Sequence, residues 1–174
     1  PRDTVWTFAS MAPGWHVTTG PGTVLYDPAT HAHGDFSLAS QVFLFPRASG
    51  EGYGIFLGGR AIGTDSASYV AVLLRGDGTA SVQQRRAGAW TVLAPWTRHT
   101  AITPNPGDKV VPNRLRVRAG ADSLRVFVND SSVLALPRGT VQLDGQVGLR
   151  VGAGLNLHVT TFDHTRHHAP VPAP

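Results

Sequence analysis

The chain has 174 residues, enough for one domain with a hydrophobic core that needs no covalent cross-links. It contains no cysteine, which excludes a disulfide framework, a thiolate zinc site and a cysteine nucleophile. Fifteen basic residues outnumber eleven acidic ones and give a net charge of +4. Because the arginines are spread along the chain, we interpret them as a solvated face and expect no nucleic-acid partner.

The sequence begins at Pro1 with no apolar leader, and no segment approaches the ~20 apolar residues that span a bilayer. We therefore expect an exported bacterial domain, periplasmic or extracellular, whose signal segment is absent from this chain. Residues 1–163 are predicted to form a single β-sandwich domain. The His-, Pro- and Ala-rich residues 164–174 are predicted to form a mobile tail.

Turn residues recur about every 8–12 positions, which predicts short antiparallel strands and minimal helix. The predicted strands are, in chain order, residues 5–8, 15–19, 23–26, 36–45, 53–57, 69–75, 79–85, 89–93, 114–118, 124–128, 133–136, 146–151 and 155–162. The strand over 36–45 does not keep one apolar phase, and a bulge near Ala39-Ser40 would restore it. Residues 95–112 are predicted to form a long loop.

Residues 114–128 predict a hairpin with one aliphatic and one arginine-rich face, because a strand points alternate side chains to opposite faces. A two-residue turn at Asn129-Asp130 then leads into the next strand. The same alternation predicts a core of Leu115, Val117, Leu124, Val126, Val128, Val147, Leu149, Val151, Leu155, Leu157 and Val159. The opposite face is predicted to carry Arg114, Arg116, Arg118, Arg125, Arg150, Asn156 and His158. Two half-buried layers of this kind predict an all-β, two-sheet antiparallel sandwich.

Five segments carry a family resemblance: residues 35–42 (DFSLASQV), 52–58 (GYGIFLG), 69–78, 124–129 (LRVFVN) and 145–152 (GQVGLRVG). Their order over nearly the whole chain resembles the concanavalin A-like lectin/glucanase jelly roll, in its laminin-G-like and keto-disaccharide-hydrolase-like branch. The resemblance implies a jelly-roll sandwich. It leaves the activity open, because the motifs belong to the scaffold and members of the superfamily either bind or cleave glycans.

Non-catalytic recognition of a glycan in a concave groove is the leading hypothesis, with an acidic polysaccharide among the candidate ligands. Aromatic rings would stack on sugars, and arginines would donate paired hydrogen bonds to hydroxyls or carboxylates. The predicted ligand-binding residues are Tyr53, Tyr69, Trp96, Arg98, His99, Arg114 and Arg116.

Two alternatives remain open. A glycan-processing hydrolase would need two carboxyl groups, yet Glu51 is the only glutamate and the E-x-D-x-E strand of the glucanase branch is missing. Asp35, Asp65 and Asp77 are the other acidic candidates. A self-assembling subunit that pairs through sheet edges is the second alternative.

A metal site receives little support from the sequence. His31 and His33 have alternating spacing and are weak candidates, because they are expected to lie in a loop. We predict no metal and no cofactor.

Overall fold

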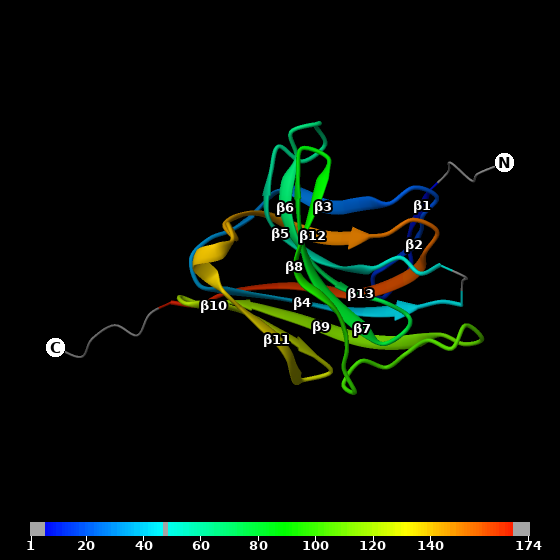
Figure 1. The fold of residues 1–174 in the computed structure, drawn as a ribbon. Helices are drawn as coiled ribbons and strands as arrows, with labels where there is room; N and C mark the ends of the chain where they lie inside the picture. Colours follow the sequence, from blue (N-terminus) through cyan, green and yellow to red (C-terminus); the bar gives the residue numbers. More distant parts are fainter. Residues whose placement is uncertain (1–5, 47–48, 169–174) are drawn as a thin grey trace.

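The computed structural model describes residues 6–46 and 49–168 of the chain. Two β-sheets face one another across a shared core (Figure 1). The strands are β1 (Thr7–Ser10), β2 (Trp15–Thr18), β3 (Thr23–Ala32), β4 (Phe36–Leu44), β5 (Tyr53–Arg60), β6 (Ser68–Leu74), β7 (Thr79–Arg86), β8 (Ala89–Arg98), β9 (Val111–Ala119), β10 (Ser123–Val128), β11 (Ser131–Pro137), β12 (Gly145–Val151) and β13 (Asn156–Arg166). A 3-10 turn, η1, covers Arg138–Thr140. The part of the chain that is described contains no helix long and apolar enough to cross a membrane.

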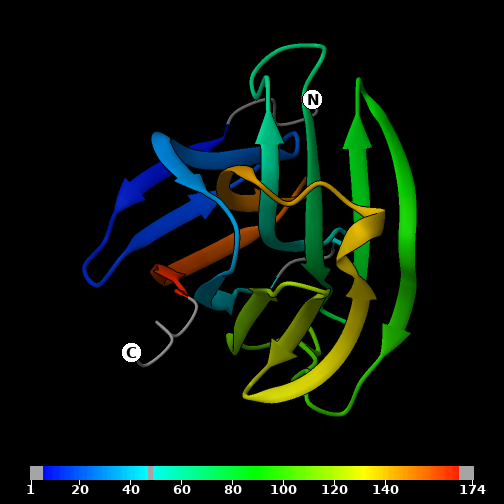
Figure 2. The same ribbon diagram turned by 90° about the vertical axis from the view of Figure 1, so that its left-hand side faces the viewer.

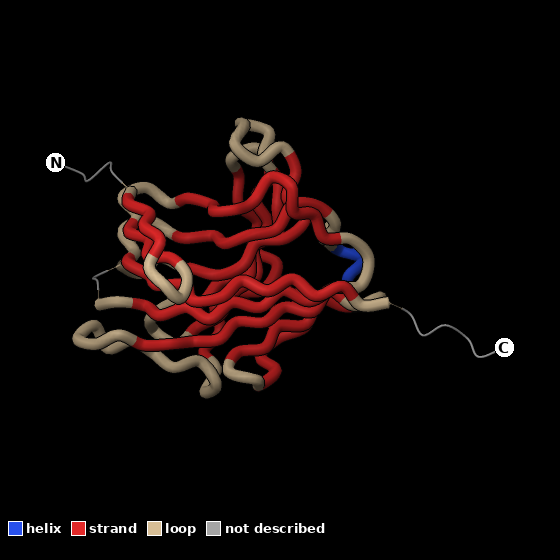
Figure 3. Tube along the Cα trace, turned by 180° about the vertical axis from the view of Figure 1, so that it is seen from behind, coloured by secondary structure: helices blue, strands red, loops and turns tan. Residues whose placement is uncertain are grey.

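Seven strands form one sheet in the order β1-β2-β13-β4-β9-β10-β11, and six form the other in the order β3-β12-β5-β6-β7-β8. Every neighbouring pair of strands is antiparallel. Strands dominate the tube in Figure 3, and η1 is its single short helical segment among the residues described. The predicted two-sheet antiparallel sandwich with minimal helix is therefore confirmed.

The inner faces of the two sheets meet in one hydrophobic cluster. All of the core positions predicted from alternation are buried, from Leu115 on β9 to Val159 on β13. The predicted hairpin is also present, because Val117 pairs with Val126 and Arg118 pairs with Arg125. Alternation identified these residues because each strand presents one face to the core and the other to solvent.

The predicted polar face is divided between two surfaces. Arg116 and Arg118 lie on β9 of the seven-stranded sheet, but Arg150 lies on β12 of the six-stranded sheet. The two outer faces point away from each other in a sandwich, so these arginines do not form one row.

The bulge predicted at Ala39-Ser40 is wrong. Every second residue of β4 from Phe36 to Leu44 is buried, and β4 pairs with β9 without a shift of register. The irregularity lies in the neighbouring strand β13, between Val159 and Thr161. The apparent change of phase arose because Ser40, a polar residue, occupies a buried position while Phe43 faces outward.

Two strands are longer than predicted because proline does not end them. β8 continues through Pro95, which places Trp96 in a strand and not in a loop, and β3 continues through Pro28. Both are edge strands of the six-stranded sheet. Proline is tolerated in an edge strand because one side of the strand has no neighbour, so a missing N–H on that side breaks no hydrogen bond between strands. β13 extends to Arg166, so the predicted tail begins inside a strand; residues 169–174 lie outside the described part.

Candidate functional site

The outer face of the six-stranded sheet carries a second apolar cluster, separate from the core. Alternate residues of β6 belong to the core and to this outer cluster. Val70, Val72 and Leu74 face the core. Tyr69, Ala71 and Leu73 face outward, where they pack with Phe56. An outer sheet face that is only solvated would carry polar residues at these positions. This face therefore has an apolar floor, which is itself buried because side chains such as Tyr26, Ile62 and Trp96 pack against it.

A pocket of about 270 Å³ opens beside this floor, where β5 begins and β6 and β12 end. We call it the arginine–tryptophan pocket. Its lining residues are Glu51, Gly52, Leu73, Arg75, Gln83, Trp90, Trp96, Arg150 and Gly152. Two indole rings and two guanidinium groups thus share one small hollow with a carboxylate and an amide.

Trp96 forms one wall of the pocket and is held from two sides. The guanidinium carbon of Arg75 lies 3.7 Å from the centroid of the Trp96 ring, which is a cation–π contact. Gly52 provides the space for the ring, since a Cβ at this position would lie 2.9 Å from Cη2 of Trp96. The indole face is consequently fixed before any ligand arrives.

Trp90 forms the second aromatic wall, and it is more exposed than Trp96. Its ring meets that of Tyr69 edge to face, with centroids 5.8 Å apart. The guanidinium carbons of Arg85 and Arg150 lie 5.5 and 5.7 Å from the Trp90 ring. Trp90 therefore lies among positively charged groups, which favours a site that attracts negative charge.

Arg150 is the most firmly placed of these arginines. Its Nη1 donates hydrogen bonds to the carbonyl oxygens of Thr23, at 2.8 Å, and Val151, at 2.9 Å. Burial lowers the pKa of Arg150, and repulsion from Arg85 lowers it further, while Tyr69 and Glu51 act in the opposite direction. Burial likewise raises the pKa of Tyr69, an effect that the two arginines oppose.

Within the described residues, no carboxylate forms a close ion pair with these guanidinium groups, although Glu51 lines the same pocket and favours the charged form of Arg150. The two ion pairs in that part of the molecule join Arg118 to Asp35 and Arg138 to Asp144, both away from this pocket. Nε of Arg75 is buried and has no hydrogen-bond partner among the described residues. Because a buried N–H without an acceptor is costly, the pocket favours a ligand that supplies a hydrogen-bond acceptor to Arg75.

The structure brings together two of the seven predicted ligand-binding residues. Trp96 lines the pocket, and Tyr69, which does not line it, packs edge to face against the lining residue Trp90. Tyr53 lies instead in the core, 1% exposed, and burial raises its pKa to about 12 against the lowering effect of its hydrogen bond with Asn113. A residue enclosed in this way cannot contact a ligand on the surface.

The other four predicted residues lie elsewhere. Arg98 ends β8, opposite Thr79, and His99 follows it, where its Nδ1 accepts a hydrogen bond from the N–H of Ala101. Arg114 and Arg116 are on the outer face of the seven-stranded sheet, where Arg116 stacks on Phe127 at 4.0 Å. The structure therefore does not unite these residues with Trp96 in one groove.

Sequence reasoning omitted Arg75, Gln83, Arg85, Trp90 and Arg150 from the ligand-binding set. The signal was available in part, because Arg85 and Trp90 occupy the outward phase of their strands and are directly paired across β7 and β8. The sequence does not show that β12 pairs with β5. This pairing brings Arg150 to the same sheet face as Arg85 and Trp90.

The weak metal candidates His31 and His33 lie near the end of β3, with their rings stacked 6.1 Å apart. Within residues 6–46 and 49–168, no group of three or more histidine or acidic side chains is arranged to hold a metal ion.

No protein-family model matches the sequence, and no curated protein matches it. Solved structures do match the fold. A carbohydrate-binding module of class CBM66 from Bacillus subtilis superposes with a TM-score of 0.71 at 16% identity, covering 92% of this chain and 95% of its own. A Bacillus subtilis protein of unknown function with a galectin-like fold gives 0.66 at 13% identity, covering 92% and 86%. Sheep galectin-11 gives 0.58 at 14% identity, covering 83% and 97%.

The fold is a two-sheet jelly-roll sandwich, similar to those of these solved structures. At these identities the likeness establishes the architecture and leaves the choice of ligand to the residues of this chain.

Proposed function

We propose that this protein is a non-catalytic glycan-binding module, exported from the cell, and that its binding site is the arginine–tryptophan pocket. The observation that carries the proposal is the grouping of Trp90 and Trp96 with Arg75 and Arg150, which form no close ion pair among the described residues. Sugars present an apolar ring face and polar edges, and a tryptophan face beside hydrogen-bond donors complements both. The likeness to CBM66 and to galectins supports the same reading.

The ligand we propose is an acidic polysaccharide, whose carboxylate or sulfate groups would be bound by Arg75 and Arg150. Guanidinium groups bind such anions through paired, charge-assisted hydrogen bonds. Arg85 adds positive charge near Trp90 and strengthens the attraction. Trp96 would stack on the sugar ring through the face opposite Arg75.

Hydrolysis of the keto-disaccharide-hydrolase type is less well supported by the pocket. It would need two carboxyl groups that flank the scissile bond. Glu51 is the single acidic residue among the described residues that line the pocket. Asp35 is engaged with Arg118 on the other sheet, and Asp65 lies in the loop between β5 and β6. We therefore assign binding without cleavage.

The test is affinity measurement with polygalacturonate, alginate and neutral dextran, at low and high salt. Trp96→Ala and Arg150→Gln should each weaken binding to the acidic polymers by about tenfold or more, as expected for the loss of a hydrogen bond to a charged group or a stacked ring. Arg116→Gln and Arg125→Gln on the opposite sheet remove the same charge and should leave affinity unchanged.

Two outcomes would contradict the proposal. Binding that falls equally for Arg150→Gln and for the two arginine variants of the opposite sheet would indicate general attraction to a cationic protein. Release of reducing ends from the polymers, dependent on Glu51, would indicate an enzyme.

A further inference from the structure

A second hollow lies between the two sheets, at the side where β1 and β3 are the edge strands. β1 ends the seven-stranded sheet and β3 ends the six-stranded sheet, and Figure 2 places β1 and β2, in dark blue, on the side away from β8, in green. The hollow measures about 320 Å³. We call it the inter-sheet pocket, and it shares no lining residue with the arginine–tryptophan pocket.

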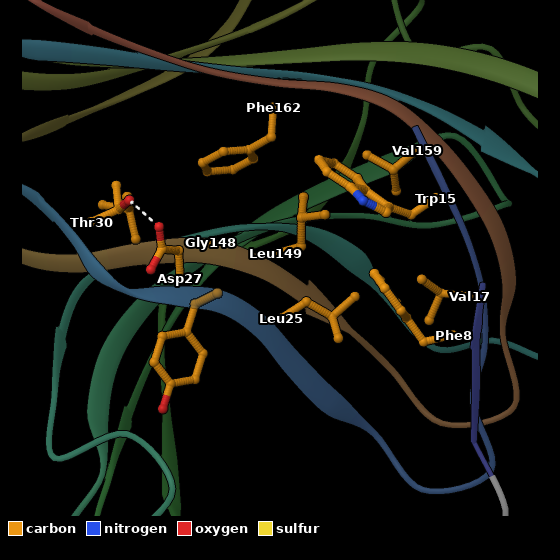
Figure 4. Close-up of a pocket in the computed structure, with 12 residues that line it drawn as sticks. Phe8, Trp15, Val17, Leu25, Asp27, Thr30, Gly148, Leu149, Val159 and Phe162 are labelled. Carbon is orange, nitrogen blue, oxygen red and sulfur yellow. Dashed lines mark hydrogen bonds between the residues drawn. The ribbon is translucent and has the colours of Figure 1, made fainter. Parts of the chain in front are cut away.

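The walls of the inter-sheet pocket are apolar and come from both sheets (Figure 4). Its lining residues are Phe8, Trp15, Val17, Leu25, Tyr26, Asp27, Thr30, Val147, Gly148, Leu149, Val159 and Phe162. The space between the sheets of a sandwich is normally filled by side chains at crystal-like density. Here Phe8 and Trp15 stay 47% and 37% exposed instead of closing over Leu25 and Leu149.

One end of the pocket is polar. Figure 4 shows Asp27 and Thr30 at one end, with Phe8 and Val17 toward the other. Asp27 is the single charged residue among the described lining residues. Its Oδ1 accepts a hydrogen bond from the N–H of Ala29 at 2.9 Å and its Oδ2 accepts one from Thr30 Oγ1 at 3.2 Å.

These two hydrogen bonds orient the Asp27 carboxylate but do not use its full capacity to accept hydrogen bonds. A carboxylate can accept about four hydrogen bonds, so each oxygen keeps capacity for a further donor. No ion pair involves Asp27 within the described residues. A ligand with a cationic head group would complement the charge of Asp27 at this end, and an apolar body would complement the apolar walls.

We propose that the inter-sheet pocket binds a small amphiphile, an apolar chain or ring with a protonated amine that pairs with Asp27. The volume sets its size: at about 30 Å³ for a water-sized group, 320 Å³ holds roughly ten non-hydrogen atoms. Covering the exposed apolar walls with an apolar ligand removes them from water, which favours binding. The inference is independent of the glycan-binding proposal, because the two pockets use different residues.

The test is calorimetry with straight-chain primary amines of increasing length, kept below micelle-forming concentrations, and with the carboxylic acids of equal length. Affinity for the amines should rise about fourfold per methylene and level off once the pocket is full. The acids should bind at least about tenfold more weakly because they repel Asp27. Bound amine should also raise the midpoint of thermal unfolding.

Two substitutions locate the site. Asp27→Asn keeps the shape and should abolish the preference for amines over acids, whereas Asp65→Asn removes an exposed charge from the loop between β5 and β6, which does not line the pocket, and should not. Leu25→Trp should fill the pocket and weaken the binding of all the amines and acids. Trp96→Ala, which lies in the other pocket, should change polysaccharide binding and leave amine binding intact.

The proposal is wrong if affinity does not depend on chain length, or if amines and acids bind equally to the unaltered protein. It is also wrong if sedimentation shows a dimer that Trp15→Ser dissociates and that amines do not disturb, since the pocket would then be covered by a second copy.

Discussion

At the scale of single residues, one buried amide connects the core to the loop after β8. Asn113 is 2% exposed, and all of its hydrogen-bonding atoms are engaged. Its Nδ2 donates to Thr103 O at 2.9 Å and to Tyr53 Oη at 3.5 Å, and its Oδ1 accepts from Thr103 N and Asn129 Nδ2, both at 2.9 Å. A buried polar network that is fully satisfied makes one arrangement of the backbone strongly preferred.

Replacing Asn113 by leucine should lower the free energy of unfolding by about 3 kcal/mol, because groups of Thr103 and Asn129 would lose their partner. Urea denaturation measures the change. Gln142→Leu is the control, since Gln142 is exposed and should alter stability by less than about 0.5 kcal/mol. A loss below about 1 kcal/mol for Asn113→Leu would show that water replaces the missing bonds.

His164 should make the fold sensitive to mild acid. Burial lowers its pKa from 6.5, with smaller contributions from Arg166 and His33, and its ring packs edge-on against Phe36. Below pH 6.5 the unfolded chain therefore binds more protons at this site than the folded one, so stability falls as pH falls through that window and is unaffected above it. NMR titration should give a midpoint for His164 below 6.5, and His164→Gln should reduce the loss of stability between pH 7 and 5.

At the scale of elements, the turn between β10 and β11 shows how local chemistry sets register. Asn129 and Asp130 adopt φ angles of 49° and 67°, and Val128 pairs with Ser131 across the two-residue connection. Positive φ at both positions matches the right-handed twist of the flanking strands. The prediction of this turn from Asn129-Asp130 is therefore confirmed.

The two turn residues should respond in opposite ways to glycine. Asp130→Gly should stabilise the protein by about 0.5 kcal/mol, because it removes the cost of positive φ from a residue with a Cβ. Asn129→Gly should destabilise it, since the Asn129 side chain donates to Ala101 O at 2.8 Å and accepts from Arg114 N at 2.9 Å. Thermal unfolding of the pair tests this, and equal effects would contradict it.

At the scale of the whole molecule, one core cluster joins the sheets. It contains Leu157 and Val159 from the seven-stranded sheet together with Ile55 and Val72 from the six-stranded sheet. Neither sheet can keep its apolar face covered alone, so we expect the two to unfold together.

Variants that retain a single tryptophan can report on each sheet. Trp15 lies on β2 of one sheet and Trp96 on β8 of the other. Their fluorescence and the far-ultraviolet circular dichroism should give the same urea midpoint. Two separate midpoints would show that the sheets unfold independently.

The arrangement of apolar residues determined the fold class without help from tertiary structure. Alternation in β9, β10, β12 and β13 identified buried residues such as Leu115 and Val126, because one face of each strand must leave water. The predicted ends of β8 and β3 were too early, because we took proline to end a strand. Whether proline ends a strand depends on the strand's place in the sheet.

The candidate site was only partly predictable. Trp96 and Tyr69 were recognised as aromatic, but the sequence cannot state which sheet a strand joins or which neighbours flank it. Arg150 reaches Trp90 because β12 pairs with β5, nearly a hundred residues away in the chain, and Tyr53 is excluded because its phase points inward. Residue type and hydrophobic period are local properties that can be read from the sequence. The pairing of strands that are distant in the chain brings the charges and rings of the site together, and only the tertiary structure decides this pairing.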